Sequence, residues 1–125
     1  MNSARCQRYK STRCDIAGGF TVQLDSKTMD DRFADLRNAT EAAVFDGGGE
    51  TPSELRRAVA KGDVPPNLAP LVEKIRLRAH SVTDTDVDGL RVHYSDDQLF
   101  ELIVAATFGA ASERLAAALR ALEDA

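Results

Sequence analysis

The sequence is poor in the residues that build redox centres, metal sites and β-sheets. Its 125 residues contain no tryptophan, two cysteines and two histidines, and only 6% are aromatic. Cys6 and Cys14 lie eight positions apart in one polar stretch, so they form no Cys-x-x-Cys redox pair. Nothing nearby completes a four-ligand zinc site. We therefore expect no metal, no cofactor and two idle thiols, the alternative being a regulatory disulfide that only their number favours.

Long apolar runs are also missing. The longest nearly uncharged stretch, Leu99 to Ala111, has 13 residues and contains Glu101, whereas a membrane-spanning helix needs about 20 apolar residues. The basic start of the chain is not followed by the apolar core of a signal peptide. We expect no membrane segment and a cytoplasmic location.

Charge is unevenly distributed, and its balance argues against nucleic acid as a partner. The first 14 residues carry four basic and no acidic side chains, and the rest carry 12 basic and 20 acidic ones. An acidic domain repels a phosphate backbone. Residues 83–109 superficially resemble a helix-turn-helix, but the second helix begins with Asp96 and Asp97, where a reader of the major groove needs Arg, Lys, Asn or Gln.

The residues that are abundant (Ala, Leu, Asp and Arg) favour helices, and the length suits one domain. Residues 1–28, interrupted by Gly18 and Gly19, lack helical periodicity and are predicted to be a disordered leader. No segment has the alternation of a strand. The sequence therefore predicts an all-α fold, a single compact bundle of about five helices over residues 29–125.

Start and stop signals delimit these helices. Apolar residues spaced by three or four from Met29 to Val44 predict the first helix, which a run of three glycines from Gly47 ends. The later helices are delimited by caps and stops at Thr51 (with Glu54), Gly62, Asn67, Thr83 (with Asp86) and Ser95 (with Gln98). The last helix is expected from about Asp96 to Leu122.

The first half of this last helix, residues 99–111, is apolar on nearly every side, which is typical of a buried helix. A domain of this size has little surface to cover such a helix, and its small residues let another helix approach closely. We expect a homo-oligomer with Ala106, Phe108 and Ala110 near the interface. The alternative is that the helix is the centre of the domain's own core.

A family resemblance is carried by the order and spacing of motifs across two helices. The motifs are Val82-Thr83-Asp84-Thr85-Asp86-Val87, then Leu90-Arg91, Ser95-Asp96-Asp97-Gln98-Leu99-Phe100-Glu101-Leu102, Arg114-Leu115 and Ala118-Leu119. Over about residues 66–121 the chain resembles the carboxymuconolactone decarboxylase and AhpD-like alkylhydroperoxidase superfamily. The resemblance implies an AhpD-like fold and assembly into trimers or hexamers.

The chemistry of that family is not carried over by these residues. Its peroxidatic members use a Cys-x-x-Cys pair whose low thiol pKa permits attack on a peroxide, and this chain has no cysteine after Cys14. If the last helix matches the cysteine-bearing helix, the place of the pair is taken by residues 109–114. If it matches the family's closing helix, the catalytic segment is missing. Both alignments predict that thiol peroxidase activity is absent.

Two residues are candidates for other chemistry. His80 lies at the end of the third predicted helix, and Glu73 lies two helical turns upstream, so the two could form an acid–base pair at a cleft. Equally, a histidine at a helix C-terminus interacts with the helix dipole, and a surface Glu pairs with a cation. We therefore expect a self-associating structural or interaction protein. The alternative is a non-thiol acid–base enzyme of the lactone decarboxylase type, which requires His80 to point into a cavity beside a second polar group.

Overall fold

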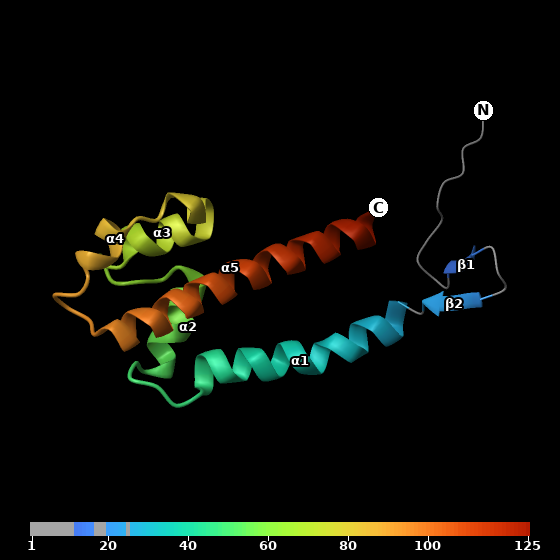
Figure 1. Ribbon diagram of the computed structural model, residues 1–125, viewed down its shortest axis with the longest axis horizontal. Coiled ribbons are helices and arrows are strands. Elements are labelled where there is room, and N and C mark those ends of the chain that lie inside the picture. Colours follow the sequence, from blue (N-terminus) through green and yellow to red (C-terminus); the bar gives the residue numbers. More distant parts are fainter. Residues whose placement is uncertain (1–11, 17–19, 25) are drawn as a thin grey trace. The chain divides into compact units, whose positions relative to one another are not determined.

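The computed structural model describes residues 12–16, 20–24 and 26–125, with side chains from residue 33 onward (Figure 1). Residue contacts divide the chain into two units, Met1–Ala39 and Thr40–Ala125. The boundary falls inside the first helix, whereas the sequence analysis placed it after residue 28. The expected disorder of residues 1–28 concerns positions of which about half (1–11, 17–19 and 25) lie outside the described residues.

The first unit contains a hairpin that the sequence analysis did not predict. Strands β1 (Thr12–Ile16) and β2 (Phe20–Leu24) pair antiparallel, with Cys14 opposite Val22. In the sequence Phe20, Val22 and Leu24 alternate with polar residues, a period-two pattern that suits a strand but is only five residues long. Helix α1 (Ser26–Asp46) follows and ends at the predicted glycines.

From residue 26 onward every described element is helical, which confirms the all-α expectation for that part of the chain. The further elements are α2 (Ser53–Lys61), α3 (Ala69–Arg78), the short 3-10 helix η1 (Ala79–Ser81), α4 (Asp84–Asp88) and α5 (Asp96–Asp124). Both late capping boxes are present: Thr83 with Asp86 opens α4, and Ser95 with Gln98 opens α5. Gly62 ends α2 with a φ of 84°, a conformation that favours glycine.

Two predicted caps are wrong. Helix α2 begins after Pro52 without a side-chain cap, and the Thr51 hydroxyl donates to Glu101 of α5 instead. Helix α3 begins after Leu68, and the Asn67 amide lies 3.3 Å from the Tyr94 hydroxyl. In both cases the side chain that the local pattern assigned to a helix cap instead forms a hydrogen bond with a residue far along the chain.

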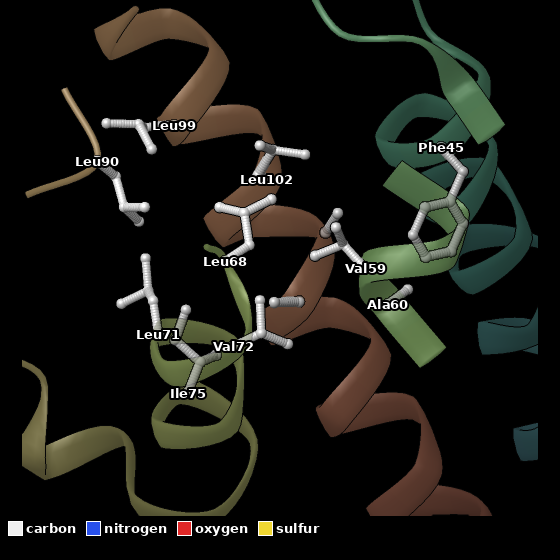
Figure 2. Close-up of a cluster of buried hydrophobic side chains, with 12 residues drawn as sticks. Phe45, Val59, Ala60, Leu68, Leu71, Val72, Ile75, Leu90, Leu99 and Leu102 are labelled. Atoms are coloured by element: carbon white, nitrogen blue, oxygen red, sulfur yellow. The ribbon is translucent and has the colours of Figure 1, made fainter. Parts of the chain in front are cut away.

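The core of the second unit lies where α5 packs on α2 and α3 (Figure 2). Val59 of α2 and Ala105 of α5 are fully buried, and Gly109 lets the two backbones meet, because a Cβ there would collide with the carbonyl group of Ala60. The other core side chains include Phe45, Leu68, Leu71, Val72, Ile75, Leu90, Leu99 and Leu102. One face of the first half of α5 is therefore covered by helices of its own chain, whereas Phe100 on this half remains 69% exposed.

The second half of α5 is different, because it continues beyond α2 and α3 (Figure 1). Leu115, Leu119 and Leu122 are 43%, 42% and 72% exposed. In the described part of the chain, α5 is also the one helix whose length and composition would allow it to cross a membrane.

Candidate functional site

An open groove of about 500 Å³ lies between the end of α1, the loop that follows it and the first turns of α5. Its apolar lining comes from Ala43 and Val44 of α1 and from Phe100 and Val104 of α5. Its charged lining consists of Glu50, Arg56, Asp97 and Glu101. The groove therefore combines an apolar wall with ionisable groups.

Glu101 fixes the loop that forms one edge of the groove. One carboxylate oxygen, Oε1, accepts the backbone N–H of Glu50 at 2.8 Å, and Oε2 accepts the backbone N–H of Thr51 at 2.8 Å and its hydroxyl at 2.5 Å. The Thr51 hydroxyl and then the Glu50 N–H lower the pKa of Glu101, so its carboxylate is ionised near neutral pH. A Cβ at Gly49 would lie 2.5 Å from Oε1, so glycine leaves room for this contact.

Arg56 lies beneath the same loop and is only 5% exposed. Its Nη2 donates to the carbonyl oxygen of Gly47 at 2.6 Å. Its Nε is buried and has no hydrogen-bond partner among the described residues. A buried donor without an acceptor is unfavourable by about 1–3 kcal/mol, so Arg56 stands out from the satisfied polar groups around it.

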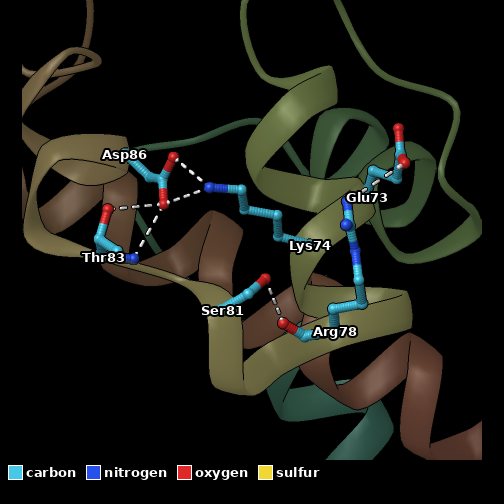
Figure 3. A network of polar contacts seen from close by, with 6 residues as sticks. All are labelled: Glu73, Lys74, Arg78, Ser81, Thr83 and Asp86. Carbon is cyan, nitrogen blue, oxygen red and sulfur yellow. Dashed lines mark hydrogen bonds and ion pairs between the residues drawn. The ribbon is translucent and has the colours of Figure 1, made fainter.

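A second polar cluster joins α3 to α4 (Figure 3). Lys74 Nζ lies 2.8 Å from both carboxylate oxygens of Asp86, and Asp86 Oδ2 also accepts the backbone N–H and the hydroxyl of Thr83. Lys74 and then Thr83 lower the pKa of Asp86 to about 2. This cluster holds the turn between two helices and does not line the groove beside α5, so we interpret it as structural.

The two candidate acid–base residues are not brought into a cleft. Glu73 is 63% exposed and pairs with Arg78 at 3.9 Å (Figure 3). His80 is exposed in η1 and makes no hydrogen bond or ion pair with another described residue. Neither residue lines the groove. Both therefore occupy the surface positions that the simpler interpretation gave them.

The predicted interface residues are mostly used within the chain. Ala106 is 0% exposed and Ala110 is 5% exposed. Phe108 is half-buried, and its ring meets that of Phe45 edge-on at 5.7 Å and 83°. Helix α2 of the same chain makes the close approach that the small residues of α5 allow. Of the three predicted interface residues, Phe108 alone keeps appreciable exposure.

Sequence reasoning missed Glu101 and Arg56 as site residues. Glu101 is the lone acidic residue in an apolar stretch, a signal that could have indicated a specific partner. Arg56 is one of two adjacent arginines in a short amphipathic helix, and nothing in the sequence distinguishes it from Arg57.

Within residues 12–16, 20–24 and 26–125, no group of three or more His, Cys, Asp or Glu side chains could hold a metal ion. No family model matches the chain, and searches of curated proteins and of solved structures give no match.

Proposed function

We propose that this chain is a self-associating interaction protein without thiol peroxidase activity, and that two copies pair through the second half of α5. The observation that carries the proposal is the exposure of Leu115, Leu119 and Leu122 on one stripe of a helix whose first half is the core of the domain. Three leucines on one stripe of a solvent-exposed helix form an apolar surface, and association would remove this surface from water.

The stripe has the spacing of a helix–helix contact. Ala105, Phe108, Ser112, Leu115, Leu119 and Leu122 follow one another at alternating intervals of three and four residues. This is the spacing of the two apolar positions of a heptad. Glu113, Arg114, Arg120 and Asp124 occupy other positions of the repeat. The same stripe, which is buried at Ala105, thus continues into the exposed half of the helix.

A second copy of the chain suits this surface, because a two-fold axis lets one stripe pair with itself. Residues 111–124 span about 21 Å of helix. A stable interface buries about 1,200 Å² or more in total, and three leucines from each copy supply only part of that area. We therefore expect a weak dimer in which the alanines between the leucines permit close approach.

The proposal includes the AhpD-like resemblance of residues 66–121. Its support is the helical order, with capping boxes at Thr83 and Ser95 at the positions that the motifs give them. In one alignment, residues that make polar contacts with α3 occupy the place of the family's cysteine pair. There Glu113 binds Arg76 at 2.5 Å, and the Arg114 guanidinium donates to the Arg76 carbonyl.

The proposal also places α5 in a water-soluble cytoplasmic domain and not in a membrane. Its support is that polar contacts tie α5 to neighbouring segments along its length, through Glu101 near its start and Glu113 past its middle. Ionised side chains are costly in the hydrocarbon core of a bilayer.

The test is a charge placed in the middle of the stripe. Leu119→Glu should turn the associated protein into a monomer, as measured by light scattering after size exclusion at high micromolar concentration, because pairing would bury two glutamates. Leu77→Glu is the matched control, since Leu77 of α3 is 71% exposed and lies off the stripe. Circular dichroism should show that both variants remain helical. Equal masses for the wild type and both variants would contradict the proposal.

A further inference from the structure

The groove beside α5 presents an apolar wall that the chain leaves uncovered. Phe100 is 69% exposed, although its neighbours Leu99 and Leu102 are each only 2% exposed. Val44 and Val104, which line the groove with it, are half-buried. Aromatic rings are enriched where proteins bind partners.

The charges at this groove leave it negative. Glu50, Asp97 and Glu101 contribute three carboxylates, and Arg56 contributes one cation. Arg56 is buried and bonded to the Gly47 carbonyl, while Glu50 and Asp97 are exposed. Glu101 is occupied by the loop, and Glu50 Oε2 accepts the Ser95 hydroxyl at 2.8 Å. The groups open to a partner are therefore Glu50 Oε1 and the Asp97 carboxylate. A positively charged group is the complement of this rim.

Arg56 lines the groove, but its Nε is buried and is therefore closed to a docking partner. The groups that a partner can meet are the acidic rim and the exposed Phe100 ring. A polypeptide supplies a complement to both together, a basic side chain for the rim and an apolar side chain for Phe100. A small cation supplies only the first.

We propose that this groove binds a basic, apolar segment of a partner protein. A lysine or arginine of the segment lies against Glu50 and Asp97, and a neighbouring apolar side chain packs on Phe100. The binding surface is separate from the leucine stripe of α5, so the same molecule holds a second copy and the partner segment at different places.

The probe is a synthetic peptide of alternating lysine and leucine, with binding to the full chain followed by fluorescence anisotropy. Asp97→Asn and Phe100→Ala change exposed side chains of the groove, and each should weaken binding by about three- to fivefold. Asp124→Asn and Val92→Ala are the matched controls, because both residues are exposed and lie outside the groove lining. Added salt should weaken binding to the wild type.

Two comparisons keep this inference apart from the proposed self-association. A glutamate–leucine peptide of the same length should not bind, and Leu119→Glu should bind the lysine–leucine peptide as the wild type does. The inference is overturned if the basic peptide fails to bind, if the acidic peptide binds equally well, or if the control variants lose as much affinity as the groove variants. A loss confined to Leu119→Glu would instead place the peptide on the leucine stripe.

Discussion

At the scale of single residues, Gly109 decides how closely α5 approaches α2. A Cβ at this position would lie 2.7 Å from the carbonyl carbon and the Cα of Ala60, and backbone atoms cannot move aside as a flexible side chain can. Gly48, in the loop after α1, has no atom within 4 Å of the place where its Cβ would be. Substituting each glycine with alanine therefore measures how much a methyl group at the contact between α5 and α2 destabilises the fold, with Gly48 as the control.

Gly109→Ala should lower the free energy of unfolding by about 1–3 kcal/mol, because the added methyl group overpacks the crossing. This loss should appear although alanine in a helix interior is otherwise favoured over glycine by about 1 kcal/mol. Gly48→Ala should leave stability unchanged or raise it slightly, since it restricts only the unfolded chain. Urea denaturation measures both, and a stabilised Gly109→Ala variant would show that the helices do not meet there.

At the scale of elements, α4 depends on its neighbours. It has five residues, and an isolated helix of that length is unstable in water. Asp86 holds it twice, by accepting from Thr83 at its N-terminus and by pairing with Lys74 of α3. The position of α4 therefore depends on the ionised form of one carboxylate.

Replacing Asp86 with Asn should lower the melting temperature at neutral pH, and the difference from the wild type should depend on pH. The folded pKa of Asp86 is lowered from 3.8 to about 2, so its contribution is complete above the unfolded pKa and is lost as the pH falls through the folded one. The difference should therefore be constant near neutral pH and shrink between about pH 4 and 2.

The control for this prediction is Asp84→Asn, which removes a carboxylate from the same turn without removing the Lys74 pair. Thermal unfolding followed by circular dichroism over a pH series compares the variants. A difference for Asp86→Asn that stays the same down to pH 2 would contradict the role assigned to its charge.

The elements that could be predicted from sequence are those that local signals decide. The boxes at Thr83 and Ser95 close within four residues, so their sequence spacing is sufficient. Thr51 was assigned to a cap, but Glu101 competes for it from 50 residues away, which no local pattern can show. The groove could not be predicted for the same reason, because three separate segments build it. Only the isolated acid at Glu101 gave a hint.

At the scale of the whole molecule, α5 carries two different surfaces. The sequence indicated that its first half is buried on most sides, and the structure buries one face of this half while Phe100 stays 69% exposed. The prediction of an interface at Ala106 and Ala110 assumed that the chain could not cover them. The chain does cover both alanines, because Gly109 admits α2 at close range. The apolar surface left for a second copy is the stripe from Leu115 to Leu122.

The most direct test of self-association is sedimentation equilibrium of the unmodified chain over a wide concentration range. We predict a mass near 13.5 kDa at low concentration that rises toward twice this value at high micromolar concentration. The rise should be absent at the same concentrations in Leu119→Glu and present in Leu77→Glu. A mass that stays at 13.5 kDa throughout would contradict the account, because it would show that the exposed leucines of α5 do not pair with a second copy.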